Sequence, residues 1–344
     1  MLTYTLKVAE VRNETSDTVT LAFKQPGLKK IRYKAGQYLT LIFRINERRY
    51  LRPYSFSSAP GFDSFLEVTI KRVPGGVVSN HICDKVQAGD VIEVMEPIGD
   101  FIVNEGAEQT GVNAILWGAG SGITPLFSIA KYLLNQQNKH HVTLVYGNRQ
   151  FDSVIFKEQL KKLQHEYPDK FKVWYFYTQL VVKDDHPNLI QGRIIPSKVL
   201  DVMNAEEDIN QLFHYICGPA GLKESVKEAL AKYNIPAEKI YYEDFELVKN
   251  EEDFIDVFTQ SVQINKDQIE SIVEVAKGKS ILEAGLDAMI EMPYSCQTGN
   301  CSVCKGTLIK GQVKQIIKRH PDLKDNEYQL CCSYPLTNDV QIII

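Results

Sequence analysis

A cluster of cysteines near the C-terminus constrains the fold of this chain more than any other feature. Cys296, Cys301 and Cys304 form a C-x4-C-x2-C run, and Cys331 and Cys332 follow. The chain's seven cysteines are odd in number and unevenly placed, which favours a metal site over a disulfide framework. This spacing is typical of a plant-type [2Fe-2S] cluster, whereas a four-cysteine zinc site usually has two C-x2-C knuckles. We therefore predict a loop that encloses an iron–sulfur cluster.

The fourth ligand is one of two neighbouring cysteines, Cys331 or Cys332. Adjacent residues of a strand face opposite sides, so only one of the two can ligate. Strand alternation that starts at Leu330 favours Cys332. Whichever it is, Gly299 permits the tight curvature of the preceding loop, and that loop's polar character lets backbone N–H groups point at the cluster sulfides.

The first part of the chain, residues 1–105, has the pattern of short β-strands. Leu66, Val68 and Ile70 alternate with polar residues, which is the period of a half-buried strand, and 19–23 show the same alternation. Glycine and proline residues divide these strands at intervals that suit an antiparallel barrel. We therefore predict an all-β domain here.

From about residue 110 the pattern changes to alternating strands and helices. Helices are expected at 123–136, 154–165 and 219–233. Strands that alternate with helices at this spacing need crossover connections, so 110–247 is predicted to be a doubly wound parallel sheet.

The rest of the chain forms a third region. The acidic segment 248–258 fits an exposed linker. Residues 259–344 then contain a strand at 261–265, a helix at 281–289 and the cysteine cluster. A length of 344 residues accommodates two or three domains, so the predicted fold class is multidomain, α/β plus β.

Two glycine-rich turns follow predicted strands of the second region. Gly118-Ala-Gly-Ser-Gly122 lets the backbone approach a pyrophosphate at a helix N-terminus, and Cys217-Gly-Pro-Ala-Gly221 repeats this layout. The alternatives are a tight strand-to-helix corner for the first turn and a small buried residue for Cys217. Pro219 suits a first helical turn. We expect a dinucleotide to bind at Gly118, Gly120, Gly122, Thr124, Pro125, Cys217, Gly218 and Pro219.

The β-strand region carries a second set of candidate ligands. A flavin site needs a cation, a hydroxyl near the ring and an aromatic surface, and Arg52, Ser55 and Tyr54 supply these types on one strand. Backbone N–H groups of a Gly-x-x-Ser segment further on can face phosphates. The alternatives are an ordinary surface strand and a simple β-turn. The candidate flavin ligands of these two segments are Arg52, Pro53, Tyr54, Ser55, Lys71, Gly76, Val77, Val78 and Ser79, and their assignment to FAD is what a family resemblance implies.

The choice between NADPH and NADH depends on the residues just after the second parallel strand. An acidic residue there bonds the ribose hydroxyl of NAD, whereas an arginine accommodates the 2'-phosphate of NADP. The sequence has Asn148-Arg149 at this place, and the nearest acid, Asp152, comes later. NADPH is favoured, NADH stays possible, and a surface arginine is the alternative.

Composition excludes several classes of protein. Apolar residues make up 44% of the chain, and no stretch is apolar for the length that a membrane span needs. The N-terminus lacks the basic start and apolar run of a secretory signal, so a cytoplasmic location is expected. A net charge of -4 gives no positive field for nucleic acid. The seven histidines show no ligand spacing that suggests chemistry.

In order along almost the whole chain, these motifs resemble the ferredoxin-NADP reductase superfamily. Arg-x-Tyr-Ser, Gly-x-x-Ser and GxGxG followed by Ile-Thr-Pro are its fingerprints. The order is that of the reductase components of bacterial multicomponent oxygenases, most of all those of the phenylacetyl-CoA epoxidase type. Phthalate-type reductases share this order of motifs but bind FMN. The Gly-x-x-Ser segment favours FAD for the present chain. The resemblance implies an antiparallel FAD-binding β-barrel (1–105), an NAD(P)-binding domain (110–247), a linker (248–258) and a β-grasp ferredoxin domain (259–344).

The resemblance also implies roles for single residues. Cys217 would lie beside the nicotinamide, Glu243 near the hydride path and Phe245 near the flavin; otherwise Phe245 is a core residue and Glu243 a solvated charge. Ser55 and Thr124 would orient the two rings, so the implied catalytic residues are Ser55, Thr124, Cys217 and Glu243.

In plant-type ferredoxins the fourth ligand commonly stands four residues before a proline. Pro335 therefore favours Cys331 over Cys332. The metal ligands implied by this resemblance are Cys296, Cys301, Cys304 and Cys331.

Electron counting links the three sites. NADPH gives two electrons as a hydride, while the cluster accepts one at a time, so a flavin between them must store the second. We expect a monomeric electron-transfer reductase that serves a partner protein: an oxygenase such as a di-iron epoxidase or a Rieske oxygenase, or a hybrid-cluster protein. A redox-sensing or interaction protein is the hypothesis from another class.

Overall fold

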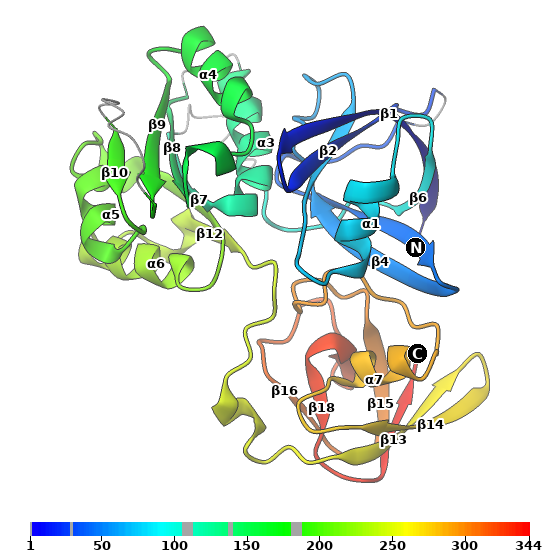
Figure 1. Ribbon diagram of the computed structural model, residues 1–344. Helices are drawn as coiled ribbons and strands as arrows, with labels where there is room; N and C mark the ends of the chain where they lie inside the picture. Colours follow the sequence, from blue (N-terminus) through cyan, green and yellow to red (C-terminus); the bar gives the residue numbers. More distant parts are fainter. Residues whose placement is uncertain (1, 28–29, 105–112, 137–139, 180–187) are drawn as a thin grey trace. The chain divides into compact units, whose positions relative to one another are not determined.

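The computed structural model describes residues 2–27, 30–104, 113–136, 140–179 and 188–344. The chain divides into two compact units, Met1–Phe43 with Pro53–Asp244, and Arg44–Arg52 with Phe245–Ile344 (Figure 1). The predicted boundary between 105 and 110 lies outside the described residues.

An antiparallel sheet forms the first part of the chain. Its six strands stand in the order β4-β3-β6-β1-β2-β5. A bridge between Phe56, just after β4, and Val68 of β5 links the two edge strands, as closure into a barrel requires. The bounds are β1 (Thr3–Thr15), β2 (Thr18–Phe23), β3 (Tyr38–Ile45), β4 (Arg48–Ser55), β5 (Leu66–Lys71) and β6 (Val91–Met95).

Two predictions for this region were wrong. The domain is not all-β, because Val77–Lys85 forms helix α1, with Gly76 as its N-cap residue. The alternation in β2 does not mark a half-buried strand, since every residue of β2 is buried. The polar residue Thr20 can be buried in this strand because its hydroxyl keeps hydrogen-bond partners. It contacts the Glu14 carboxylate at 2.8 Å and the Thr69 hydroxyl at 2.7 Å.

A parallel sheet of order β10-β9-β8-β7-β11-β12 forms the rest of the first unit. Its strands are β7 (Ala114–Ala119), β8 (Val142–Asn148), β9 (Phe171–Tyr177), β10 (Leu189–Gln191), β11 (Phe213–Cys217) and β12 (Ile240–Glu243). Alternate residues of β7 face two separate cores, with Leu116 packing on one side and Trp117 on the other. The predicted doubly wound sheet is confirmed.

Four helices cover the two faces of this sheet (Figure 1). They are α3 (Ile123–Leu134) and α4 (Lys157–Glu166) on one face, and α5 (Pro196–Met203) and α6 (Leu222–Lys232) on the other. Helix α6 begins later than predicted, because Gly221 at its N-cap has a φ of 90°. Pro219 therefore lies in the turn before the helix and not in its first turn.

The second unit is built on a mixed sheet of order β14-β13-β19-β15-β17 and a two-stranded sheet β16-β18. The bounds are β13 (Gln260–Lys266), β14 (Ile269–Val275), β15 (Lys305–Lys310), β16 (Val313–Gln315), β17 (Glu327–Gln329), β18 (Ser333–Pro335) and β19 (Val340–Ile343). Helix α7 (Ile281–Asp287) starts at a capping box between Ser280 and Glu283. It ends two residues before the predicted Met289, which has a φ of 61°.

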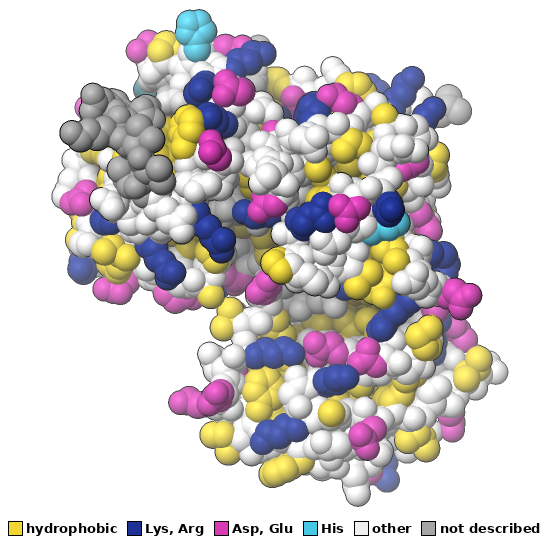
Figure 2. All heavy atoms as spheres, viewed as in Figure 1, with side chains coloured by type: hydrophobic (Ala, Val, Ile, Leu, Met, Phe, Trp, Pro, Cys, Tyr) yellow, Lys and Arg dark blue, Asp and Glu magenta, His cyan; other side chains and the backbone are white. Residues whose placement is uncertain are grey.

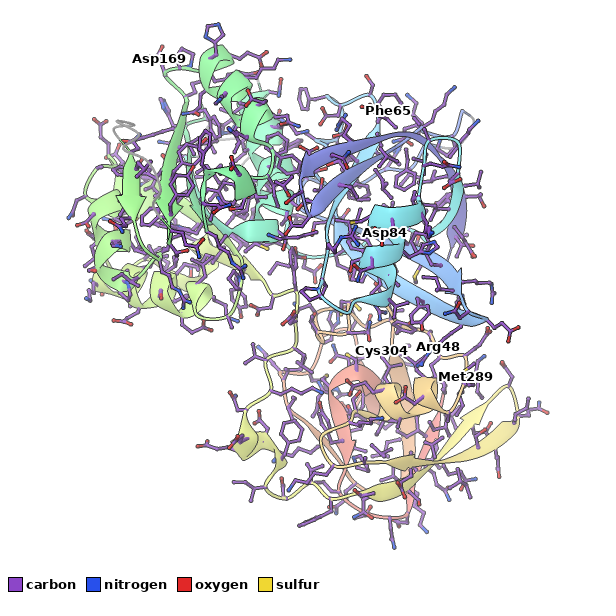
Figure 3. All side chains as sticks on the ribbon, in the orientation of Figure 1. Arg48, Phe65, Asp84, Asp169, Met289 and Cys304 are labelled. Carbon is purple, nitrogen blue, oxygen red and sulfur yellow. The ribbon has the colours of Figure 1, made fainter. Side chains whose placement is uncertain are left out.

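The tip of the β3–β4 hairpin belongs to the second unit. The Arg48 guanidinium contacts the Asp287 carboxylate at 3.1 Å, and the Tyr294 hydroxyl accepts the backbone N–H of Leu51 at 3.0 Å (Figure 3 labels Arg48). The acidic segment 248–258 is only partly exposed, since Val257 is buried.

The surface drawn in Figure 2 carries basic and acidic side chains interspersed with one another. None of the helices in the described ranges has the length and apolar character that crossing a bilayer requires.

Candidate functional site

The two glycine-rich turns lie at the carboxyl ends of neighbouring parallel strands. Strands β7 and β11 pair with Gly118 opposite Cys217. The chain continues from β7 toward β8 and from β11 toward β12, on opposite sides, so the strand order reverses here. Open α/β sheets bind ligands at such a reversal.

Gly122 allows the two turns to touch. A Cβ atom at this position would lie 2.1 Å from the carbonyl oxygen of Cys217 and 2.8 Å from the nitrogen of Gly218. The predicted turn is therefore a tight corner as well as a phosphate-binding candidate. Gly120 has open space around it and a φ of 55°, as a backbone that approaches a ligand closely needs.

Thr124 and Pro125 lie in the first turn of α3, and both are buried. The Thr124 hydroxyl donates to the carbonyl oxygen of Ser121 at 2.9 Å. This bond holds the glycine turn against the helix N-terminus, where backbone N–H groups are left free for an anion.

The end of β8 contains a buried side-chain amide, that of Asn148. Asn148 is 8% exposed, and its Nδ2 has no hydrogen-bond partner among the residues that the structure describes. Arg149, the next residue, is exposed. Because a buried amide donor without a partner is costly, this end of the sheet fits a polar ligand such as a nucleotide.

Three of the predicted catalytic residues lie together. The Ser55 hydroxyl donates to the Glu243 carboxylate at 3.3 Å, which joins the end of β4 to the end of β12. Glu243 pairs with Cys217 across β12 and β11. Burial, and then the charges of Glu243 and Asp244, raise the pKa of Cys217 well above its ordinary value. Cys217 is therefore a neutral thiol.

Three residues of β4 keep part of their surface exposed. Arg52, Pro53 and Tyr54 are each half-buried, so each keeps surface for a ligand. The Arg52 guanidinium donates to the carbonyl oxygen of Leu51 at 2.8 Å. Phe245 is 43% exposed, so the alternative of a core residue was wrong.

The Gly-x-x-Ser segment forms the start of α1 and not a simple β-turn. Gly76 is the N-cap, Val77 is 47% exposed, and Val78 is buried. The Ser79 hydroxyl accepts the backbone N–H of Val73 at 3.1 Å and so shapes the turn before the helix. Lys71 forms an ion pair with Asp17 at 3.5 Å.

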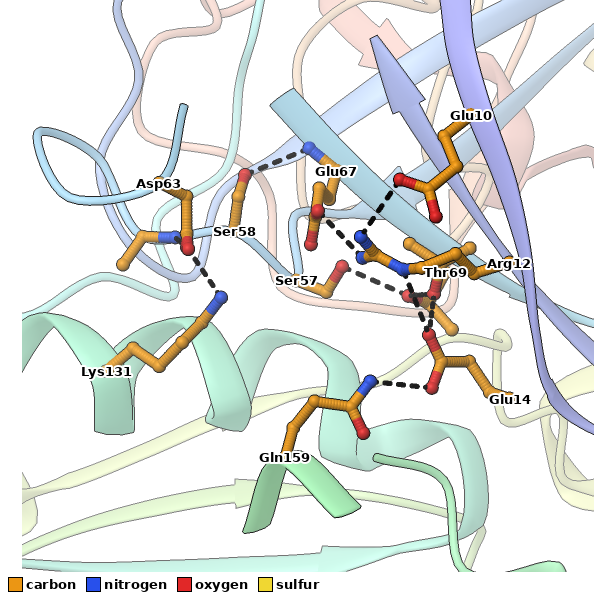
Figure 4. A network of polar contacts seen from close by, with 12 residues as sticks. Glu10, Arg12, Glu14, Ser57, Ser58, Asp63, Glu67, Thr69, Lys131 and Gln159 are labelled. Atoms are coloured by element: carbon orange, nitrogen blue, oxygen red, sulfur yellow. Dashed lines mark hydrogen bonds and ion pairs between the residues drawn. The ribbon is translucent and has the colours of Figure 1, made fainter. Parts of the chain in front are cut away.

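Polar contacts hold the barrel strands against helices α3 and α4 (Figure 4). Lys131 of α3 pairs with Asp63 at 2.5 Å, and Gln159 of α4 donates to Glu14 of β1 at 3.0 Å. Ser128 also donates to the carbonyl oxygen of Ser58, at 2.6 Å. These bonds fix the barrel and the parallel sheet as one unit.

The cysteine loop brings buried thiols together in the second unit. The Cys301 thiol donates to the Cys296 sulfur at 3.0 Å, and the backbone N–H of Thr298 donates to the same sulfur at 3.5 Å. The pKa of Cys296 is lowered by the Cys301 thiol and, in addition, by the backbone N–H groups of Thr298 and Asn300. A loop that stabilises thiolate at this sulfur suits metal binding.

Cys331 joins this group. The pKa of the Cys304 thiol lies well above its ordinary value. The larger cause is its contact with the Cys331 thiol, and the smaller is burial. The argument from strand alternation was wrong, because Leu330–Cys332 forms a 3-10 turn. Cys332 is fully buried, and its thiol donates to the carbonyl oxygen of Gln329 at 3.4 Å.

The donor set fits a cluster of two irons. A two-iron, two-sulfide group spreads four thiolates around a larger body. Four buried cysteines, with one backbone N–H directed at the Cys296 sulfur, match this requirement (Figure 3 labels Cys304): Cys296, Cys301, Cys304 and Cys331.

Sequence reasoning missed Gln329. Its fully buried amide donates to carbonyl oxygens of the cysteine loop, those of Gly299 and, at 3.0 Å, Cys301. A glutamine two residues before Cys331 has no spacing rule that identifies it, so only the folded chain shows this role.

Three family models match in order along the chain. They are an oxidoreductase FAD-binding domain over residues 5–102, an oxidoreductase NAD-binding domain over 116–228 and a 2Fe-2S iron-sulfur cluster binding domain over 264–337.

Curated relatives match over nearly the full chain. A subunit of 1,2-phenylacetyl-CoA epoxidase from Escherichia coli (strain K12) is 32% identical over 353 residues, which cover 98% of this chain and 97% of that protein. The ferredoxin reductase component of 3-ketosteroid-9-alpha-monooxygenase from Mycobacterium tuberculosis (strain CDC 1551 / Oshkosh) is 30% identical over 358 residues, which cover 98% of this chain and 94% of that protein.

A solved structure shares the fold. Phthalate dioxygenase reductase superposes with a TM-score of 0.67 at 22% identity, and the match covers 99% of this chain and 98% of that one.

Proposed function

Because this chain belongs to the family of ferredoxin reductase components of oxygenases, we propose that it carries electrons from NADPH through FAD and a [2Fe-2S] cluster to a partner oxygenase. The predicted family, fold class and enzyme class, an electron-transfer reductase, are confirmed by the comparisons. The observation that supports the proposed route most strongly is the Ser55–Glu243 contact, since it joins the candidate flavin strand to the candidate nucleotide edge.

The residues of the first unit would bind and orient the two-electron donor. Bound FAD supplies the conversion between a two-electron donor and a one-electron acceptor. The turns at Gly122 and Gly218 present backbone to the dinucleotide, and Thr124 keeps the first turn in place. The Ser55 hydroxyl and the Glu243 carboxylate hold a hydrogen bond where the nicotinamide and the flavin would meet. Cys217, which pairs with Glu243 across β11 and β12, is buried.

NADPH is the proposed donor. The exposed guanidinium of Arg149 stands next to Asn148, whose buried Nδ2 lacks a partner within the described ranges, at the edge where the adenosine ribose would lie. A guanidinium there pairs with a 2'-phosphate through charge-assisted hydrogen bonds. NADH lacks this phosphate, so we expect it to bind more weakly.

The proposed acceptor is a multicomponent oxygenase of the phenylacetyl-CoA epoxidase type, because the matching subunit of that enzyme aligns with nearly all of this chain. Cys296, Cys301, Cys304 and Cys331 would hold the cluster from which single electrons leave. We further propose three functional domains (1–105, 110–247 and 259–344) and a monomer in the cytoplasm.

The test uses purified protein, NADPH and cytochrome c as a one-electron acceptor. We expect steady reduction of cytochrome c over many turnovers, and faster reduction of the proposed oxygenase than of a Rieske oxygenase. A protein that binds its cofactors but turns over neither acceptor would instead be a redox sensor, and the proposed function would be wrong.

A further inference from the structure

Gln329 connects the cysteine loop to the rest of the second unit. Its side chain is fully buried at the end of β17. Its Nε2 donates to the carbonyl oxygens of Gly299 and Cys301, and both carbonyls belong to the loop between the first and the third cysteine. One side chain therefore holds two peptide groups of that loop.

The oxygen of the same amide also makes two hydrogen bonds. Its Oε1 accepts from the side-chain amide of Gln315 at 2.9 Å and from the backbone N–H of His320 at 3.1 Å. A primary amide has two donor hydrogens and two acceptor lone pairs, and all four are used here. The orientation of Gln329 is thus fixed by groups on β16 and on the segment before β17.

Fixing a carbonyl group also fixes the N–H of the next residue. In a trans peptide the C=O and the following N–H point in opposite directions. Holding the Gly299 carbonyl toward Gln329 therefore turns the N–H of Asn300 away from Gln329. The same loop carries the backbone N–H of Thr298, which donates to the Cys296 sulfur at 3.5 Å. The loop that Gln329 holds therefore directs a backbone N–H at a cysteine sulfur.

We propose that Gln329 is a positioning residue that orients backbone N–H groups of the cysteine loop toward the cluster and thereby raises its reduction potential. The inference rests on the proposed function, since it requires the [2Fe-2S] cluster. N–H groups directed at sulfur stabilise the reduced state, which carries one more negative charge, more than the oxidised state. Gln329 touches no electron carrier itself and acts only through the loop.

The experiment is a redox titration of the full chain followed by the electron paramagnetic resonance signal of the reduced cluster. Gln329→Met keeps the length of the side chain and removes every hydrogen bond of the amide. We expect its iron content to equal that of the wild type, and its equilibrium constant for reduction to fall about tenfold, which equals about 59 mV for one electron. Gln315→Met, which removes one support of Gln329, should shift the potential in the same direction by less.

Gln312→Met is the matched control, because Gln312 is a glutamine of the same unit outside the buried amide network. We expect its potential to equal that of the wild type. A loaded Gln329→Met protein with wild-type potential would overturn the inference, and so would a Gln329→Met protein that holds no iron, since Gln329 would then serve assembly and not the potential. A wild-type protein without iron would refute the proposed function itself, which separates the two failures.

Discussion

The two ligand-binding regions of this molecule are built in different ways. In the first unit, the candidate nucleotide edge is formed by backbone: glycine turns at the ends of β7 and β11 leave space where a Cβ atom would collide. In the second unit, the candidate cluster site is formed by side chains on an irregular loop, and the distant Gln329 orients that loop. The first site therefore depends on regular secondary structure, while the second depends on contacts between segments far apart in sequence.

The largest effect is expected from Cys301→Ser, which removes one thiolate of the loop. We expect loss of the cluster's iron and of cytochrome c reduction, while NADPH still reduces the flavin, because the first unit keeps its own contacts. Iron analysis and stopped-flow absorbance measure the two results. Cys83→Ser is the control, because Cys83 is a free cysteine on helix α1 of the first unit and does not belong to the cysteine loop. Normal cytochrome c reduction by Cys301→Ser would show that electrons leave by another route.

Gly122→Ala tests the backbone-built site. The added Cβ would meet the Cys217 carbonyl oxygen at 2.1 Å, and such overpacking against backbone costs roughly 3 kcal/mol. Tryptophan fluorescence in urea measures the loss, because both tryptophans, Trp117 and Trp174, lie in the parallel sheet. The control is Gly27→Ala, where a Cβ meets nothing within 4 Å. Equal stability of the two variants would contradict the close contact.

These two sites were predictable from sequence to different degrees. The glycine turns and the cysteine spacing are local signals, so Gly122 and Cys301 could be named in advance. Gly76 was named as well, but not the helix that follows it, because a Pro-Gly-Gly sequence predicts a turn. The left-handed φ of Gly221 and the 3-10 turn at Cys331 depend on packing that no local pattern records.

Arg149→Gln should weaken NADPH far more than NADH. Loss of a charge-assisted contact to the 2'-phosphate costs about 2 kcal/mol, which is roughly a 30-fold rise in the KM for NADPH. Steady-state kinetics with both nucleotides measure the ratio, and Lys161→Gln on the exposed surface of α4 is the control. An equal loss for both nucleotides would refute the role of Arg149 at the 2'-phosphate.

The smallest effect per unit of the varied quantity concerns pH and the first unit alone. Burial, with a lesser effect of Lys239, lowers the pKa of His214 from 6.5 to about 3, and its Nδ1 accepts from Trp117 at 3.2 Å. Below pH 6.5 the unfolded chain binds a proton that the folded chain rejects. The free energy of unfolding should therefore fall by about 1.4 kcal/mol per pH unit as pH drops toward 3.

His214→Gln keeps an acceptor for Trp117 and should remove this pH dependence in urea unfolding followed by tryptophan fluorescence. The exposed His165→Gln should leave it unchanged. If the slope persisted in His214→Gln, another group would be responsible for it.

The central claim is that one chain joins a flavin to a two-iron cluster. Its most direct test is the metal and flavin content of the purified protein, with the visible spectrum before and after NADPH. We predict about two irons per chain, FAD as the released flavin, and bleaching of both absorbances by NADPH. Zinc without iron at the cysteine loop, or a folded protein without flavin, would contradict the claim.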